Sequence, residues 1–122
     1  MTESDGEAVK AVWKFHLEVT EWQHIKMPEG AEPLSVQIID NRLWLWAMVD
    51  VDATETRRLF RTLETGQRIS TYEARGLAHV ATYQSLAGGF IYHLFDCVST
   101  RFADLQLLPD GTYAPRPKAN LP

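Results

Sequence analysis

Residues 34–49 read LSVQIIDNRLWLWAMV and decide the fold. Apolar residues at every second position alternate with Ser and Gln in the first arm, and the second arm, 42–49, alternates again. This period, with β-branched and aromatic side chains, is typical of β-strands. Asp40-Asn41 between the arms favours the tight turn of a β-hairpin. Trp44 and Trp46 lie on the side of the second arm that faces away from Leu45. Both sides of this arm are therefore apolar, which predicts a central strand.

The same alternation occurs upstream of the hairpin. Residues 9–20 place Trp13 and Phe15 on one face and charged or polar residues on the other. A shorter alternating piece at 23–27 is closed by Pro28-Glu29-Gly30. Both segments are predicted to be strands.

A second hairpin is predicted downstream. Residues 77–84 (LAHVATYQ) and 89–96 (GFIYHLFD) are strand-like and are joined through Ser85-Leu86-Ala87-Gly88. Together these segments predict an all-β fold, a compact antiparallel β-sandwich or open barrel of about six to eight strands. The residues expected in its core are Trp13, Phe15, Val36, Ile38, Leu45, Ile91 and Phe95.

Residues 53–64 leave two interpretations open. Asp52 with Glu55 resembles a capping box, Leu59, Phe60 and Leu63 have helical spacing, and a glycine follows, so one short helix at 53–64 is one alternative. The run 57–63 also alternates well enough for a strand.

Length and composition indicate one domain with a proper core. The chain has 122 residues, 45% of them hydrophobic, with a net charge of −4. We expect a single β domain at 9–97, an acidic lead at 1–8, and at 98–122 a short strand or turn around 102–108 followed by a Pro-rich C-terminal tail. The acidic charge gives no attraction to nucleic acid or anionic lipid, and no apolar run is long enough to span a membrane. We therefore expect a cytoplasmic protein without membrane or nucleic-acid partners.

Several short pieces occur in order along residues 11–96. They are Trp13-Lys14-Phe15, Ile25-Lys26-Met27-Pro28 with Gly30-Ala31, Leu34-Ser35-Val36-Gln37, Leu45-Trp46-Ala47 with Val49-Asp50, Thr65-Gly66-Gln67, Ala81-Thr82-Tyr83-Gln84, and Gly88-Gly89 before Tyr92-His93-Leu94-Phe95. Together they resemble a family of short proteins of unknown function that is common in bacteriophage genomes. The pattern of that family has His at the position of Gln67 and Gly at the position of Ala81. The resemblance favours a strand at 57–64 and implies no assigned activity.

Histidines are the first candidates for a metal site. A three-residue loop in the second hairpin would place His79 opposite His93, whereas a four-residue loop would pair His93 with Val80. No third ligand is evident, so we expect no metal, and a structural role for His93 is favoured. Asp50-Val51-Asp52 is interpreted as a solvated loop or helix start rather than a cation site.

Nucleophilic catalysis has no convincing residues in the sequence. Cys97, the only cysteine, follows a strand without a glycine elbow, and no serine lies in a G-x-S-x-G context. We expect no enzyme activity and no cofactor.

Arginines are concentrated within residues 57–75 of this acidic chain. Guanidinium groups near aromatic rings are used in phosphate recognition, although a solvated strand face is the alternative. Strand alternation predicts Arg57 and Arg61 on one face and Arg58 on the other. The ligand-binding residues expected here are Arg57, Arg58, Arg61, Gln67, Arg68, Tyr92 and His93.

These observations favour a phage-encoded, non-enzymatic binding or inhibitor protein. Its target in the host cytoplasm would be a host protein or a small anionic, nucleotide-like ligand. The alternatives are a virion accessory or capsid decoration protein and, last, a small enzyme. Trp44 and Trp46 predict an apolar interface, most simply in a symmetric homodimer.

Overall fold

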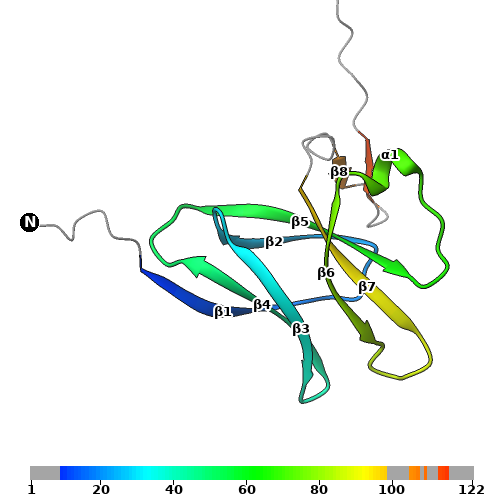
Figure 1. The fold of residues 1–122 in the computed structure, drawn as a ribbon, viewed down its shortest axis with the longest axis horizontal. Helices are drawn as coiled ribbons and strands as arrows, with labels where there is room; N and C mark the ends of the chain where they lie inside the picture. Colours follow the sequence, from blue (N-terminus) through cyan, green and yellow to red (C-terminus); the bar gives the residue numbers. More distant parts are fainter. Residues whose placement is uncertain (1–8, 99–104, 108, 110–112, 116–122) are drawn as a thin grey trace, which may run out of the picture.

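The computed structural model of the protein describes residues 9–98, 105–107, 109 and 113–115. It is built mostly from strands, as the sequence predicts (Figure 1). The acidic lead and most of the predicted tail lie outside the described residues. In chain order the elements are β1 (Lys10–His16), β2 (Trp22–Pro28), β3 (Glu32–Ile39), β4 (Arg42–Asp50), β5 (Glu55–Glu64), α1 (Thr71–Ala74), β6 (Leu77–Gln84), β7 (Ile91–Cys97), β8 (Leu105–Leu107) and β9 (Tyr113–Pro115).

One sheet has three strands in the order β1-β4-β3, all antiparallel. Leu45 of β4 lies opposite Phe15 on one side and Val36 on the other, so these three side chains share the inner face. The β3–β4 turn has φ of 52° at Asp40 and 63° at Asn41, as a two-residue turn of type I′ requires. The predicted hairpin and the central position of its second arm are confirmed.

The second sheet has four antiparallel strands in the order β2-β5-β7-β6. β5 pairs with β2 on one side and β7 on the other, so residues 55–64 form a strand and the helical alternative at 53–64 is wrong. Its consecutive residues 59–63 are all buried, because both faces of this strand are covered. A strand buried on both faces reads as a near-continuous apolar run, which explains the helix-like spacing of Leu59, Phe60 and Leu63.

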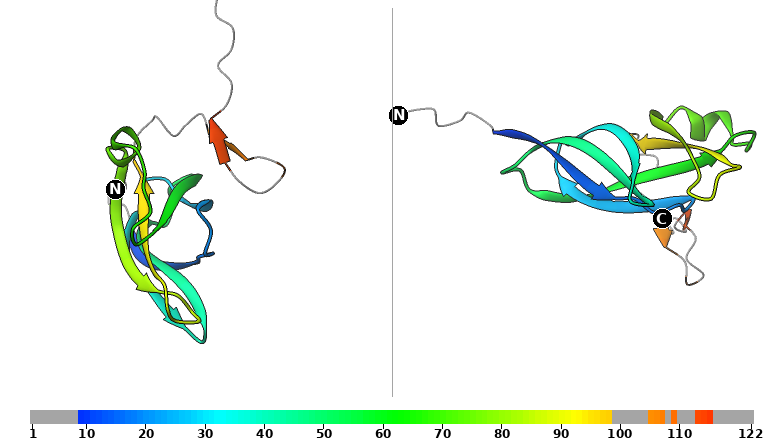
Figure 2. Two further views of the ribbon diagram at one scale, coloured as in Figure 1. Left: turned by 90° about the vertical axis from the view of Figure 1, so that its right-hand side faces the viewer. Right: turned by 90° about the horizontal axis from the view of Figure 1, so that it is seen from below.

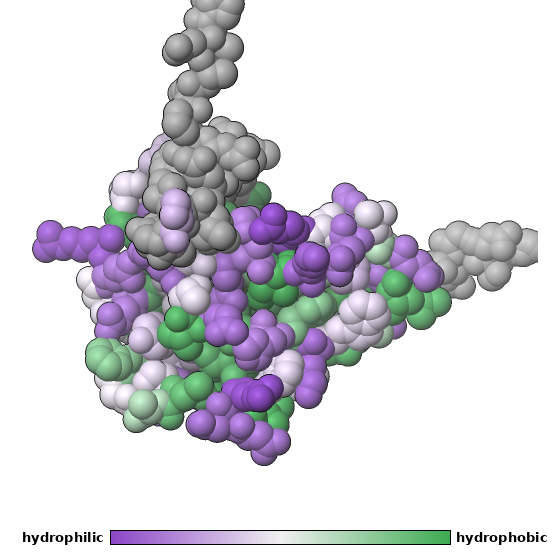
Figure 3. Space-filling view, turned by 180° about the vertical axis from the view of Figure 1, so that it is seen from behind, coloured by the Kyte–Doolittle hydropathy of each residue, from purple (hydrophilic) through white to green (hydrophobic). Residues whose placement is uncertain are grey.

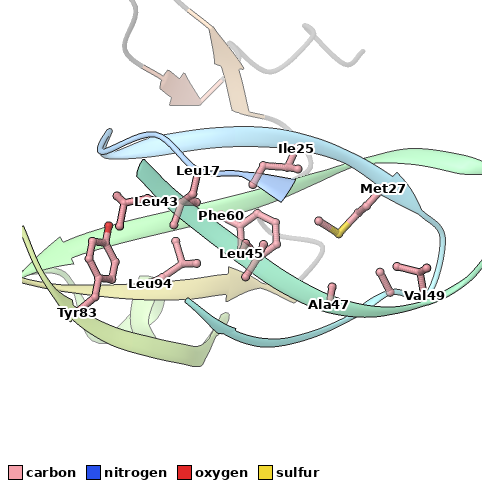
Figure 4. Packing of buried hydrophobic residues seen from close by; sticks show 11 residues of the cluster. Leu17, Ile25, Met27, Leu43, Leu45, Ala47, Val49, Phe60, Tyr83 and Leu94 are labelled. Carbon is pink, nitrogen blue, oxygen red and sulfur yellow. The ribbon is translucent and has the colours of Figure 1, made fainter. Parts of the chain in front are cut away.

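The two sheets pack face to face as an open β-sandwich (Figure 2). β3 runs beside β6 without a hydrogen-bonded ladder between them, so the sheets do not close into a barrel. The interior is filled from both sheets, with Phe60 and Leu45 near the centre and Tyr83 at one end (Figure 4). The core cluster comprises Leu17, Ile25, Met27, Ala31, Leu43, Leu45, Ala47, Val49, Phe60, Tyr83 and Leu94.

Several residues expected in the core lie elsewhere. Trp13 is 41% exposed because β1 is an edge strand, and Ile38 is 43% exposed near the tip of the β3–β4 hairpin. On β7 the predicted face is wrong: Leu94 packs in the core, while Phe95 and the exposed Ile91 point to the other side. Leu45 is fully buried, and Phe15 and Val36 pack against the core as partly buried residues.

Neither register that the sequence left open for the second hairpin occurs. The loop between β6 and β7 spans residues 85–90, and an irregularity at Val80 shifts the pairing. His93 consequently lies opposite Thr82, and His79 lies opposite Phe95. The two histidines are therefore not direct cross-strand neighbours.

The short helix α1 was not predicted. Ser70 caps it, since its Oγ accepts a hydrogen bond from the Glu73 amide at 3.0 Å. With four residues, α1 offers too little periodicity to be recognised in the sequence. β8 lies within the predicted strand or turn at 102–108 and pairs with β9.

Apolar side chains are also scattered over the surface. The largest exposed fractions belong to Tyr72, Val98 and Val9. On the side of the molecule opposite to that seen in Figure 1, hydrophilic residues separate the hydrophobic residues of the surface (Figure 3). Among the described residues, no helix is long and apolar enough to cross a membrane.

Candidate functional site

A shallow cavity of about 220 Å³ opens where β5 ends and β7 begins. The connection between β1 and β2 forms one wall, because the Thr62 amide donates a hydrogen bond to the Glu21 carbonyl at 2.9 Å. The end of β5, the following turn and Tyr92 of β7 form the others. The lining residues are Val19, Thr20, Glu21, Thr62, Glu64, Gln67 and Tyr92. Gln67 and Tyr92 are two of the residues that the sequence predicted for ligand binding.

Buried hydroxyl groups lie where the core meets the cavity. Thr62, which lines the cavity and is 5% exposed, and Tyr83, which packs in the core, have hydroxyl oxygens without a hydrogen-bond partner among the described residues. Burial raises the pKa of Tyr83, and the nearby Thr62 hydroxyl opposes this rise. The two hydroxyls are thus neighbours, but they do not meet hydrogen-bond geometry. The Tyr92 ring lies 5.8 Å from that of Tyr83 and completes this polar, aromatic boundary.

Gln67 holds the rim of the cavity together. Its Oε1 accepts a hydrogen bond from the Glu64 amide at 3.0 Å, and its Nε2 donates to Glu21 Oε2 at 3.3 Å. The turn that places it is tight: Gly66 has φ of +90°, and the Gln67 amide donates to the Glu64 carbonyl at 2.9 Å. The side chain of Gln67 therefore connects the β1–β2 connection to the end of β5.

Arg61 lies next to this rim but is not free. It is 4% exposed, and its Nε donates to Glu73 Oε2 at 2.8 Å. Its Nη1 lies 2.8 Å from Glu21 Oε2, in an ion pair that does not meet hydrogen-bond geometry. The guanidinium carbon lies 4.3 Å from the centroid of the Trp22 ring. Arg61 thus ties β5 to the β1–β2 connection and to α1.

Arg58 lies on the inner face and makes contacts within the fold. It forms a bidentate ion pair with Asp96 at 3.0 and 2.6 Å, and its Nη1 donates to the Ala31 carbonyl at 2.9 Å. Four residues along a strand separate it from Thr62, which corresponds to about 13 Å. Arg58 therefore supports the sandwich interior away from the cavity.

Arg57 and Arg68 are exposed. Arg57 lies beside Lys26 in the pairing of β5 with β2. The pKa of the neighbouring His24 is lowered, mainly by burial and secondarily by the Arg57 charge. Neither arginine lines the cavity. The prediction that Arg57 and Arg61 lie on one side of the strand and Arg58 on the other is confirmed. The structure does not bring the three guanidinium groups together.

Residues 8–101 match a family model described as a domain of unknown function, DUF7352. The chain belongs to this family. Searches of curated proteins and of solved structures found no match. The matched residues include the whole cavity and both hairpins. Membership in a family of unknown function agrees with the expectation from the sequence, and the function is therefore argued from the site itself.

His93 and Tyr92 point to opposite faces of their strand. The His93 ring contacts Thr65 Oγ1 at 2.7 Å through Nε2 and Thr82 Oγ1 at 2.9 Å through Nδ1. Thr82 Oγ1 also lies 3.0 Å from His79 Nε2. Both nitrogens of His93 are thus engaged by threonines, in agreement with the structural role favoured from the sequence. Among the described residues, no group of three or more His, Cys, Asp or Glu side chains is placed to hold a metal.

The Cys97 thiol is poorly suited to nucleophilic chemistry. Burial and, secondarily, the Asp96 carboxylate raise its pKa to about 12, against a smaller opposing effect of Arg61. At neutral pH the group is therefore a thiol and not the reactive thiolate.

Trp44 and Trp46 lie on the outer face of the three-stranded sheet, opposite His16 and Lys14. Lys14 Nζ lies 4.3 Å from the centroid of the Trp44 ring, and the His16 ring meets it edge-on at 5.7 Å. Both tryptophans are half-buried. Their predicted sidedness is confirmed, whereas their role as an interface stays a prediction.

Sequence reasoning missed most of the cavity. Glu21, Thr62 and Glu64 are ordinary strand-end or loop residues in the sequence, and they come together only through the pairing of β5 with the β1–β2 connection. The one usable signal was the Thr65-Gly66-Gln67 turn, which did lead to Gln67.

Proposed function

We propose that this protein is a non-enzymatic binding protein that holds a small polar ligand in the cavity lined by Thr62, Glu64, Gln67 and Tyr92. The observation that carries the proposal is the solvent-open cavity of about 220 Å³, which is lined by Glu64, Gln67 and Tyr92. Gln67 links the Glu21 carboxylate to the Glu64 amide across the rim, so the walls that a small polar molecule would contact are already held in place.

The states of two candidate catalytic groups support binding rather than chemistry. The raised pKa of Cys97 disfavours a thiolate nucleophile, and the threonines that flank His93 occupy both of its ring nitrogens. A general base needs a free nitrogen within reach of its substrate.

A thermal-shift screen with small polar compounds tests the proposal. Some compounds should raise the melting temperature of the wild type saturably, because a ligand that binds only the folded state stabilises it. The rise in melting temperature should be smaller in Gln67→Ala, which lacks the side chain that links the two sides of the cavity rim. It should be unchanged in Arg57→Ala, which alters an exposed arginine outside the cavity. Loss of the temperature rise in Arg57→Ala, together with a wild-type response in Gln67→Ala, would place the site on the face of β5 that carries Arg57.

We further propose that the protein is phage-encoded and acts in the host cytoplasm, where binding would sequester a ligand or inhibit a host protein. The order of the short motifs along residues 11–96 supports a phage source. A virion accessory or decoration protein is the alternative. Proteomics of purified virions separates the two, since a cytoplasmic protein should be present in infected cells and missing from the virions.

A second candidate function is self-association through the outer face of the three-stranded sheet. Trp44, Trp46 and Met48 are half-buried there, and Trp and Met are enriched at interfaces. A homodimer would place two copies of this face together around a twofold axis. Native mass spectrometry should show twice the 13.9 kDa chain mass at micromolar concentration, and Trp46→Glu should return it to one chain. A wild type that stays at one chain at tens of micromolar excludes this interface.

A further inference from the structure

We propose that β1 is the contact edge of a symmetric homodimer, in which the β1 strands of two copies pair antiparallel and join the two three-stranded sheets into one. This inference goes beyond ligand binding in the cavity. The edge of β1 is a different surface from the outer face that carries Trp44 and Trp46, so the two dimers are alternatives. The inference follows from the backbone of β1, from the other edge strands, and from the charges along β1.

The backbone groups of β1 alternate between β4 and the free edge of the sheet. At one end of the strand the Leu17 amide donates to the Leu43 carbonyl at 3.1 Å, and at the other end the Val51 amide donates to the Val9 carbonyl at 3.0 Å. Both bonds continue the register of the β1–β4 ladder, so the odd-numbered residues of β1 form its hydrogen-bonded pairs. The N–H and carbonyl groups of the even-numbered residues point away from β4 and have no backbone partner among the described residues. These residues are Lys10, Val12, Lys14 and His16.

The other three edge strands each carry features that hinder pairing with a further strand. β3 contains Pro33, β6 is irregular at Val80, and these two strands lie beside each other. On β2, Pro28 has no N–H, and the Trp22 carbonyl already accepts a hydrogen bond from the Thr20 hydroxyl. Prolines and bulges are the features by which proteins block edge strands. β1, at the lower left border of the molecule in Figure 1, has neither and pairs with β4 without a break.

The two lysines of β1 select one register for the pairing of two copies. Pairing centred on Trp13 lets the whole strand overlap, and every free N–H of one copy then meets a free carbonyl of the other. Val12 lies opposite Lys14 of the second copy, and Lys10 lies opposite His16. A shift by two residues would place Lys14 opposite Lys14 or Lys10 opposite Lys14, and like charges directly opposite each other destabilise a sheet.

This register also covers apolar side chains that the single chain exposes. Trp13 is 41% exposed at the centre of the pairing, and Val12 beside it is 48% exposed. The two copies of Trp13 would form a pair without direct hydrogen bonds, in which the side chains of an antiparallel sheet lie closest. Aromatic cross-strand pairs of this kind stabilise sheets. The same edge therefore offers both unpaired backbone groups and a self-complementary apolar centre.

Native mass spectrometry at tens of micromolar tests the inference. The wild type should have twice the 13.9 kDa chain mass. Val12→Pro should return it to one chain, because it removes an N–H that donates across the edge and leaves the bonds to β4 in place. Val12→Thr keeps this N–H and is the matched control, which should stay dimeric. Trp46→Glu should also stay dimeric, because the outer face takes no part in the edge pairing.

Disulfide trapping tests the register and does not depend on the proline variant. In a Cys97→Ala background, Trp13→Cys should form a covalent dimer on mild oxidation, because the two Cα atoms would lie within the range that a disulfide spans. His16→Cys in the same background is the control. It should stay as single chains, since the two copies of residue 16 would lie about 20 Å apart along the paired strands.

The results that would overturn the inference are distinct from those that bear on the cavity. A wild type that stays at one chain overturns it, and so does a folded Val12→Pro that stays dimeric. A monomeric Trp46→Glu beside a dimeric Val12→Pro would assign the interface to the outer face instead. If Val12→Pro does not fold, the trapping experiment decides, and absence of a covalent Trp13→Cys dimer overturns the inference. Ligand binding in the cavity is measured separately by the thermal-shift screen.

Discussion

At the scale of single residues, contacts rather than residue type determine what the arginines do. Arg58 is engaged by Asp96 and the Ala31 carbonyl, and Arg61 by Glu21 and Glu73. Their abundance in the sequence favoured anion binding, but sequence alone could not show that acids distant in the chain pair with two of them. Strand alternation did predict correctly which arginines share a face, because that depends only on the period of two.

Arg58→Ala should destabilise the fold by about 3–5 kcal/mol, because it leaves the buried Asp96 carboxylate without its partner. Replacing both residues, as Arg58→Met with Asp96→Leu, should restore most of that loss. Urea unfolding of the three proteins measures this. The exposed Arg57→Ala is the control and should change the free energy of unfolding by less than about 0.5 kcal/mol. An Arg58→Ala variant as stable as this control would show that the ion pair contributes nothing.

The Cys97 thiol should make stability depend on alkaline pH. Its pKa is raised to about 12 in the folded protein from the ordinary value of 9.0, so folding favours the protonated thiol. The resulting stabilisation is fully present below about pH 9 and is lost as the pH rises toward 12. Between pH 8 and 11, the wild type should therefore lose more free energy of unfolding than Cys97→Ala. Parallel pH profiles of the two proteins would contradict the raised pKa.

At the scale of elements, the sequence predicted strands well where one face is polar. β3 and β4 lie where the sequence predicted them, and the residues of the Asp40-Asn41 turn indicated that they form a hairpin. β5 was ambiguous because burial of both faces removes the period of two, and it was resolved only by its pairing with β2 and β7. The register of β6 and β7 was not predictable, since it depends on an irregularity at Val80 and a six-residue loop.

The turn between β3 and β4 gives a prediction at this scale. Asn41 has φ of 63°, which β-branched residues adopt only with strain. Asn41→Val should destabilise the protein by about 1–2 kcal/mol, and Asn41→Gly should not destabilise it. Thermal or urea unfolding tests this, with Gln37→Val in the same hairpin as a control for the change in β-propensity. Equal stability of the two Asn41 variants would be inconsistent with a left-handed turn at this position.

At the scale of the whole molecule, the fold class followed from the sequence and the cavity did not. Period-two patterns are local, so an all-β fold with two hairpins could be predicted. The cavity joins residues 19–21, 62–67 and 92, which approach one another only after both sheets have formed. Trp13 and Ile38 are more exposed than the sequence predicted, for the same reason. Whether a residue lies on an edge strand or at the tip of a hairpin depends on the order of the strands in the sheets.

Amide chemical-shift mapping during a titration with a ligand found in the thermal-shift screen tests the central claim most directly. If the cavity is the binding site, saturable shifts should concentrate at Thr20, Thr62, Glu64, Gln67 and Tyr92. The amides of Arg57 and Arg68 should stay in place. Shifts centred on those two arginines or on the Trp44 face, with the cavity amides unmoved, would contradict the claim.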